Sequence, residues 1–474
     1  MHPNGALNQR DNNNFQPRLG LAWHARDKLV LRGGFAVNTV DVKFPLLRAQ
    51  FDEYVGQVNL QRAPGDPSQL FQISAGPGSF TLPLRSNGTA GFVGTNYSGR
   101  NVEWWDPNLH NAYVLNWQTS VQYQLANNYL VEGSYQGSSG VDLLERWNVN
   151  TFPIDFGRGH PALQNQVLAA SQNFRPYPNY GNIYQRSNFG HSTYHGGTIK
   201  VDKRMADGLT FSTFYTYSKA IDSQDNDNDG SGVPPIQNRR LEKARASYDR
   251  NHRFIAFATY QLPVGKGRRF MNRGGVLNAI FGGYEIAWIQ TLESGNPYIF
   301  GFAGSPYNYF PGFAGNQRPD LVKTPTLLPD WGNMGGDRFN QANRNPIIDI
   351  NAFAYPGSAL GCPNTIPASL TASDRQALID KCSFQVGNSG RNIMTGTPLL
   401  WSQFSAQKNW RIRERWGVQL RYDFQNVFHN YNWSNPTLAV NFRDPASFAK
   451  LTADQRTASI GGQALMNLTL QIAW

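Results

Sequence analysis

The chain has 474 residues, a formal net charge of +11, 16% charged residues and 13% aromatic residues. It contains no run of about 18 apolar residues, which excludes a membrane-spanning helix. A transmembrane strand stays possible, because it needs only about 10 residues and exposes every second one to lipid. The Lys and Arg residues are scattered and form no helical basic stripe, so we expect no nucleic-acid partner.

Alternation of apolar and polar residues is the main structural signal. It is clearest between Tyr113 and Leu125, where the even positions from Asn116 to Gln124 are all Asn, Gln or Ser. A period of two predicts a strand with one apolar and one polar face. The rule predicts about eleven strands: Phe15 to His24, Leu29 to Asn38, Tyr113 to Leu125, Tyr129 to Ser138, Ser192 to Arg204, Leu209 to Lys219, Arg253 to Leu262, Tyr284 to Glu293, Leu399 to Arg411, Trp416 to Phe428 and Ala464 to Trp474.

The predicted strands are joined alternately by short turns and by long segments. An outer-membrane barrel sorts its connections in this way, with short turns in the periplasm and long loops outside. This parity places the end of the last strand on the periplasmic side. Short turns follow His24, Leu125, Arg204 and Arg411, whereas long segments follow Asn38, Ser138, Lys219, Glu293 and Phe428.

Two connections differ from the rest. Residues 295–398 form the longest segment, and we expect an ordered surface loop that includes a helix at Ala372 to Lys381. A longer, basic connection after Leu262 contains Gly265 to Arg269. It lacks the spacing of a phosphate-binding P-loop, so we interpret it as a basic turn between strands.

Aromatic residues gather near the predicted strand ends. Interfacial girdles of a membrane barrel would explain them, and the preference of Trp and Tyr for strands is the alternative. The residues concerned are Trp23, Tyr260, Tyr284, Trp401, Trp410, Trp416 and Trp474.

Seven short stretches occur in a specific order: Pro17 to Ala22, Leu31 to Phe35, Val131 to Ser138, Tyr215 to Asp222, Tyr248 to Phe254, Gly387 to Asn392, and Asp423 to His429 before Asn435-Pro436. In this order they resemble TonB-dependent receptors of the Oar-like group. The resemblance implies an all-β fold, namely an antiparallel transmembrane β-barrel with long extracellular loops. The chain would be the second half of a 22-stranded barrel in the bacterial outer membrane.

The same resemblance implies how such a barrel works. Extracellular loops bind an unknown small ligand, which moves through the lumen when the inner-membrane TonB complex pulls on an N-terminal plug. Neither a plug nor a signal peptide is visible, so we expect residues 1–474 to be the C-terminal portion of a receptor, as a fragment or a truncated product. Further expected partners are outer-membrane lipid and the outer-membrane assembly machinery, which would recognise the terminal Trp474.

Cys362 and Cys382 are the two cysteines of the chain. In an oxidising compartment they would form a disulfide that closes a loop of about twenty residues. Two free thiols are the alternative.

An acidic motif with the pattern D-x-D-x-D-G comprises Asp225, Asp227, Asp229 and Gly230. Oxygen ligands at alternate positions suit Ca²⁺, although position twelve is Ile236 where an EF-hand has a bidentate Glu. A solvated acidic loop is the alternative, and no other cofactor is expected.

Charged residues also crowd one junction between a loop and a strand, at Asp249, Arg250, His252 and Arg253. They are candidates for a ligand-binding vestibule at the barrel rim, and a local ion-pair network is the alternative.

No hydrolase signature is present, so we do not expect an enzyme. The competing hypothesis is a secreted all-β carbohydrate-binding protein or glycosidase that stacks sugars on Trp and Tyr. A glycosidase needs paired carboxylates. The candidates Asp249, Glu285 and Glu293 suggest no pair, and the loop parity would have no explanation.

Overall fold

The computed structural model describes residues 11–41, 101–153, 156–157, 160–225, 236–309, 317–329, 331, 345–412, 416–428, 430, 432–451 and 465–473. Its main element is a 13-stranded sheet, in which eleven strands pair one after another in chain order. These are β1 (Arg18–Arg26), β2 (Leu29–Val40), β4 (Ala112–Ala126), β5 (Tyr129–Asn148), β6 (Ile183–Ala206), β7 (Leu209–Asp222), β9 (His252–Gln261), β10 (Tyr284–Glu293), β16 (Leu399–Ile412), β17 (Trp416–Gln425) and β19 (Leu465–Ala473).

All ten ladders along this path are antiparallel. The eleven predicted strands and the antiparallel all-β fold are therefore confirmed. Two short strands lie off the path: β3 (Val102–Trp105) pairs with β6 in parallel, and β8 (Ala244–Arg245) pairs with β7. Within the described residues no ladder joins β1 to β19, so these two strands are the edges of an open sheet.

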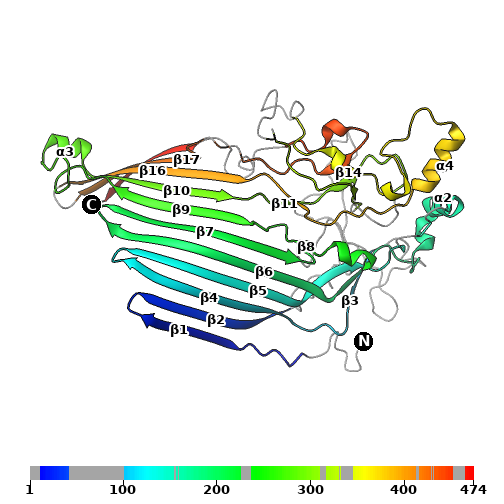
Figure 1. The fold of residues 1–474 in the computed structure, drawn as a ribbon, viewed down its shortest axis with the longest axis horizontal. Coiled ribbons are helices and arrows are strands. Elements are labelled where there is room, and N and C mark those ends of the chain that lie inside the picture. Colours follow the sequence, from blue (N-terminus) through cyan, green and yellow to red (C-terminus); the bar gives the residue numbers. More distant parts are fainter. Residues whose placement is uncertain are drawn as a thin grey trace, which may run out of the picture.

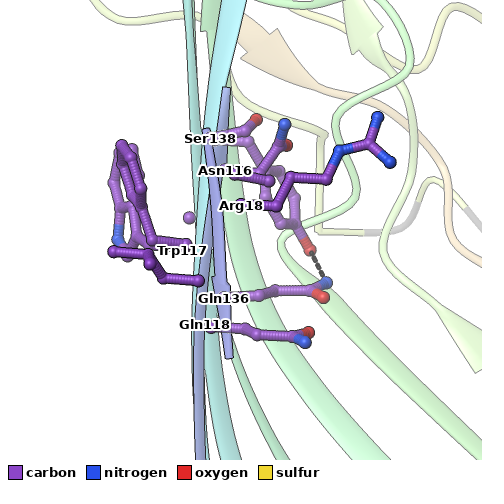
Figure 2. A pocket seen from close by; sticks show the side chains of 12 residues that line it. Arg18, Asn116, Trp117, Gln118, Gln136 and Ser138 are labelled. Atoms are coloured by element: carbon purple, nitrogen blue, oxygen red, sulfur yellow. Dashed lines mark hydrogen bonds between the residues drawn. The ribbon is translucent and has the colours of Figure 1, made fainter. Parts of the chain in front are cut away.

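The two faces of the sheet differ in chemistry because successive side chains of a strand point to opposite sides. Trp117 lies on one face of β4, whereas Asn116 and Gln118 lie on the other (Figure 2). Following the register from each strand to the next shows that Trp117 on β4 lies on the same face of the sheet as the exposed Leu468 and Leu470 on β19. We call this apolar side the outer face and the opposite, polar side the inner face.

The two ends of the sheet differ in their connections (Figure 1). At one end lie two-residue turns such as Asp207-Gly208, together with the C-terminal end of the chain. Both turn residues have positive φ, at 53° and 80°, as the hairpin turn of type I′ requires. The long segments gather at the other end, and the predicted sorting of connections by length is thus present in the fold.

The long segments contain short elements of their own. The predicted helix is present as α4 (Ala372–Cys382), and its first turn is capped by the Thr371 side chain, which accepts a hydrogen bond from the Asp374 amide. The others are α2 (Pro161–Ala170), η2 (Ser171–Phe174), η3 (Ile236–Leu241), β11 (Pro297–Tyr298), β12 (Gly301–Ala303), β13 (Asp320–Leu321), η5 (Ile350–Ala352), β14 (Phe353–Ala354), η6 (Ser358–Leu360), β15 (Met394–Thr395), β18 (Ala439–Asn441) and η7 (Pro445–Ser447).

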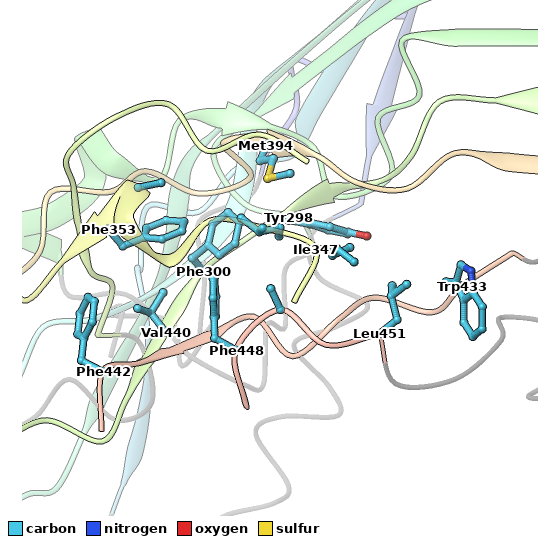
Figure 3. Close-up of a cluster of buried hydrophobic side chains, with 13 residues drawn as sticks. Tyr298, Phe300, Ile347, Phe353, Met394, Trp433, Val440, Phe442, Phe448 and Leu451 are labelled. Atoms are coloured by element: carbon cyan, nitrogen blue, oxygen red, sulfur yellow. The ribbon is translucent and has the colours of Figure 1, made fainter. Parts of the chain in front are cut away.

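Two of the long segments share one hydrophobic core (Figure 3). Strand β12 pairs with β18 in parallel, which brings together residues more than a hundred positions apart. Around this pair the ring of Phe300 lies 4.6 Å from that of Phe353 and 6.2 Å from that of Phe448, measured between centroids. We call the described residues of 294–398 and 426–451 the loop cap. The expected ordered surface loop is therefore a folded unit that covers one end of the sheet.

Among the described residues, α3 (Val276–Phe281), in the connection between β9 and β10, is the only helix outside the long segments. Among the described residues no helix is both long and apolar enough to cross a membrane.

Candidate functional site

The rim where β7, β9 and β10 meet the loop cap contains most of the predicted vestibule residues. Asp249 is almost completely buried, with 2% of its surface exposed. One carboxylate oxygen accepts a hydrogen bond from the Ala220 amide at 2.8 Å, and the other pairs with Arg245 Nε at 2.8 Å. Asn251 donates a further hydrogen bond to it. The Asp249 carboxylate thus holds the loop before β9 against the end of β7.

Two arginines of the rim share one carboxylate. Glu293 Oε1 lies 2.8 Å from Arg253 Nε, and Glu293 Oε2 lies 3.8 Å from Arg250 Nε. Arg250 also donates to the Ser294 carbonyl oxygen at 2.7 Å, and its burial lowers the pKa of its guanidinium, an effect that Glu293 opposes. The side chain of Arg253 stays 52% exposed. Of these two arginines, Arg253 is therefore the one that a solute can reach.

His252 belongs to a different surface. Its register partner is Tyr217, so its side chain lies on the outer face, where its Nδ1 lies 2.7 Å from the Tyr215 hydroxyl. The four predicted vestibule residues are thus neighbours in sequence but not one site in space. Asp249 is internal, the two arginines pair with Glu293, and His252 points outward. A role of these residues in ligand binding stays a prediction.

A second group of charges, which the sequence interpretation missed, fixes the loop cap to the sheet. Arg391 is buried, with 6% of its side chain exposed. It pairs with Asp222 at the end of β7 and, through Nη1, with Asp225 Oδ2 at 2.7 Å. Its Nε also donates to the Glu242 carbonyl oxygen at 3.2 Å. One guanidinium from the loop cap therefore neutralises two carboxylates, one at the end of β7 and one in the segment that follows it.

Arg318 extends this network. Its Nη2 contacts both carboxylate oxygens of Glu242, at 2.6 and 2.8 Å. Next to Arg318, Gly387 has no room for a side chain, because an added Cβ would lie 1.9 Å from the Arg318 carbonyl oxygen. We call the set of Asp222, Asp225, Glu242, Arg318 and Arg391 the cap network. Members of the network did occur in sequence signals, namely the stretches Tyr215 to Asp222 and Gly387 to Asn392, which carried a family resemblance without an assigned role, and the acidic motif at Asp225.

The acidic motif overlaps this network. The carboxylate of Asp225 pairs with Arg391 and accepts a hydrogen bond from the Ser247 amide at 2.7 Å. Asp227 and Asp229 lie outside the described residues. In the part of the chain that the structure describes, no three acidic, His or Cys residues are placed to hold a metal ion. Calcium binding by this motif stays a prediction.

A disulfide joins Cys362 and Cys382 within the loop cap, across a separation of 20 residues. Both cysteines are buried against Tyr307 and Tyr355, so the link closes a packed part of the cap. Burial raises the pKa of the Tyr307 hydroxyl to about 12. Trp474 lies outside the described residues.

A hollow of about 470 Å³ beside β1 and its neighbouring strands is lined by polar side chains of the inner face and by apolar side chains such as Leu19, Phe35 and Trp117. Gln136 donates a hydrogen bond to the Tyr194 hydroxyl at 3.4 Å across this surface (Figure 2). Its single charged residue, Arg18, donates to the Asn38 side-chain oxygen. The hollow can therefore hydrogen-bond a polar solute. Its lining comprises Arg18, Leu19, Gly34, Phe35, Ala36, Asn116, Trp117, Gln118, Gln136, Gly137, Ser138 and Tyr194.

A family model described as "Outer membrane beta barrel domain" matches residues 2–463. The chain belongs to this family. An outer membrane β-barrel lies in the outer membrane of a bacterium, and its apolar outer face lies against lipid.

The barrel is also similar to solved structures, although it covers less than half of each. YddB of Escherichia coli, an outer membrane transporter, is 7% identical, with 97% of this chain and 40% of that chain covered and a TM-score of 0.46. The FrpB iron transporter of Neisseria meningitidis is 11% identical, with 90% and 37% covered and a TM-score of 0.36. The ferripyoverdine receptor of Pseudomonas aeruginosa is 7% identical, with 97% and 32% covered and a TM-score of 0.38. Among curated proteins no match was found.

The outer face of this barrel carries most of the aromatic residues that the girdle interpretation names. Tyr260, Tyr284 and Trp410 lie on the outer face near the turn end, as their registers show. Trp401 is an exception, because its partner Thr291 belongs to the inner face. The girdle interpretation is therefore wrong for Trp401. Trp474 lies outside the described residues.

Proposed function

We propose that this outer membrane barrel is the C-terminal barrel portion of a TonB-dependent receptor. The loop cap would bind a small ligand at the cell surface, and TonB-driven movement of a plug would open its way through the lumen. One observation carries the proposal: the long connections form a folded cap with its own hydrophobic core, held on the rim by the cap network. A barrel whose connections are only short turns and open loops does not need to bury charged residues in this way.

The proposed path of the ligand begins at the rim and continues along the inner face. Arg253 is the first contact that we assign, because it is exposed while its neighbours Asp249 and Arg250 are engaged internally. Beyond the rim, Gln118 and Gln136 offer uncharged hydrogen-bonding groups. Such groups can pass a polar ligand from one to the next without binding it tightly.

The remaining partners follow from the same proposal. The inner-membrane TonB complex would act through a plug, and the outer-membrane assembly machinery would insert the barrel. Lipid does not tolerate unpaired strand edges, so β1 and β19 would pair with further strands in the working receptor. Transport, with no chemical step, is the proposed activity. The competing secreted carbohydrate-binding protein or glycosidase disagrees with membership of an outer membrane barrel family.

Uptake by whole cells tests the proposal. Cells that express the receptor are given three labelled probes, namely a ferric hydroxamate siderophore, cobalamin and a malto-oligosaccharide. We expect uptake of at least one probe, and we expect that uptake to stop when a protonophore removes the energy source of TonB. Arg253→Ala should weaken uptake. Lys323→Gln, which breaks an exposed ion pair of the loop cap away from the rim, should leave uptake unchanged. Receptor-dependent uptake that persists with the protonophore, or no receptor-dependent uptake of any probe, would contradict the proposal.

A further inference from the structure

The connection between β9 and β10 differs from the other turns at its end of the sheet. Its neighbours between β1 and β2, β4 and β5, and β6 and β7 have two residues each, whereas this one spans residues 262–283 and contains α3. It has four basic residues and no acidic one. We call residues 262–283 the basic connection. Figure 1 places α3 at the end of the sheet that holds the short turns, which is the periplasmic end.

The four cations of the basic connection are Lys266, Arg268, Arg269 and Arg273. All four are exposed, and within the described part of the chain none of them forms an ion pair. Arg268 donates a hydrogen bond at 2.9 Å to the neutral side chain of Gln261, which the register of β9 places on the inner face. The connection thus presents a net positive surface that no acidic side chain of the described residues neutralises through an ion pair.

The same connection exposes large apolar side chains. In α3 these lie at 276, 277, 280 and 281, and the spacing of one, four and five residues puts them on one side of the helix. An exposed apolar cluster beside cations marks a surface that contacts something other than water. The exposed apolar residues are Phe270, Met271, Val276, Leu277, Ile280 and Phe281.

Two side chains of β16 show where this apolar cluster lies. Lys408 Nζ donates to the carbonyl oxygens of Ile280, at 3.0 Å, and of Gly282. Trp410 Nε1 donates to the carbonyl oxygen of Ala279 at 2.8 Å. Ala406 of β16 pairs with Tyr422, which lies on the outer face. Lys408 and Trp410 lie two and four residues further along β16 and therefore point to the same outer face. The end of α3 is therefore tied to the lipid-facing side of the sheet and not to the lumen.

We propose that the basic connection binds the periplasmic leaflet of the outer membrane. The apolar side of α3 inserts among the acyl chains, and Lys266, Arg269 and Arg273 bind the phosphates of anionic phospholipids, whereas Arg268 is held by inner-face Gln261. Two observations favour lipid over a periplasmic protein as the occupant. The apolar cluster continues the lipid-facing surface of the barrel, and its unpaired positive charge complements anionic headgroups. This contact is independent of the ligand that the receptor carries.

The first arm of the test asks whether α3 touches acyl chains. The full chain carrying Leu277→Cys is labelled with a polarity-sensitive fluorophore and folded into vesicles of phosphatidylethanolamine and phosphatidylglycerol. The native cysteines are disulfide-bonded and do not compete for the label under non-reducing conditions. Val322→Cys in the loop cap is the matched control, because Leu277 and Val322 are 60% and 61% exposed.

We expect lipids with a nitroxide on the acyl chain to quench the label at 277 several-fold more than the label at 322. Aqueous iodide should show the reverse order. A label at 277 that iodide quenches as strongly as the one at 322, with no quenching from the acyl chains, overturns the proposal and points to a periplasmic protein as the occupant.

The second arm asks whether the contact prefers anionic lipid. Quenching of the label at 277 by nitroxide-labelled phosphatidylglycerol is compared with quenching by the same label on phosphatidylcholine. Each Lys or Arg near an anionic surface strengthens the attraction by at most about fivefold, so the three cations Lys266, Arg269 and Arg273 should give a ratio well above one. Replacing all three by Gln should return the ratio to about one. A ratio of one in the unreplaced chain overturns the anionic part of the proposal, whether or not the replaced chain folds.

Discussion

The cap network gives the sharpest prediction of the structure. Arg391→Ala removes a buried guanidinium that neutralises Asp222 and Asp225 and that donates to the Glu242 carbonyl oxygen. Breaking a buried ion pair by removing one partner costs about 3–5 kcal/mol, because the remaining charge stays buried without compensation. We expect a cost of this size in the free energy that opens the loop cap, and less in the unfolding of the membrane-spanning strands.

Amide hydrogen exchange followed by mass spectrometry measures this opening. A loss of about 3–5 kcal/mol corresponds to exchange faster by a factor of about a hundred to a few thousand in residues 236–249 and 385–395. The control is Lys323→Gln, which breaks the exposed pair between Lys323 and Asp349 and should cost less than about 1 kcal/mol. Equal exchange in the two variants would refute the reasoning, since it would mean that burial of the cap network does not control opening.

The pH dependence of the same variant gives a second check. Asp222 is the last of the 14 residues of β7 and lies beyond the about 9–11 residues that cross a bilayer. Burial, opposed by Arg391 and reinforced by Asp225, raises the pKa of Asp222 to about 6 from an ordinary 3.8. A raised carboxyl pKa stabilises the fold below pH 3.8, and this contribution is lost as the pH rises through 6. Arg391→Ala should therefore cost less at pH 5 than at pH 7, because a neutral Asp222 needs no counter-charge.

Three further predictions concern packing. At Gly137 an added Cβ would lie 2.4 Å from the Trp117 ring, so Gly137→Ala should lower the free energy of unfolding in urea by about 1–3 kcal/mol. Gly133 on the same face has nothing within 4 Å of an added Cβ, so Gly133→Ala should leave the free energy of unfolding unchanged. Replacing both Cys362 and Cys382 by Ser should lower the stability of the loop cap by about 2–4 kcal/mol, seen as faster limited proteolysis of residues 357–386; unchanged proteolysis would contradict a structural role. Phe300→Ala should cost about 3–5 kcal/mol in cap stability by thermal melting, and Val322→Ala, at an exposed position, should cost little.

The sequence predicted the membrane-spanning part of the fold well. A strand between lipid and a wet interior must alternate, and this alternation located all eleven strands of the path. The predicted strands were too short for β5, which continues to Asn148, and for β6, which begins at Ile183. In these extensions the ladder is interrupted near Gly140 and Leu143. Beyond the membrane the faces contact loops and not lipid, so the physical cause of alternation is absent there.

The loop cap and the rim could not be predicted from local patterns. The core of the cap depends on the pairing of Gly301 with Ala439, and no periodicity links positions so far apart. The cap network joins Asp222, Glu242 and Arg391 from three separate segments, and each of them resembles an ordinary surface charge in the sequence. The vestibule residues do not form one site for a related reason, since adjacent strand positions such as His252 and Arg253 point to opposite faces.

The direction of the two edge strands limits how the sheet can close into a barrel. Eleven strands that alternate in direction leave β1 and β19 running the same way across the membrane. Direct pairing of these two edges would be parallel, whether within one chain or between two copies in the same orientation. An entirely antiparallel cylinder therefore requires an odd number of additional strands between them. Eleven additional strands, half of a 22-stranded barrel, meet this condition. An even number of additional strands would leave one pair of neighbouring strands parallel.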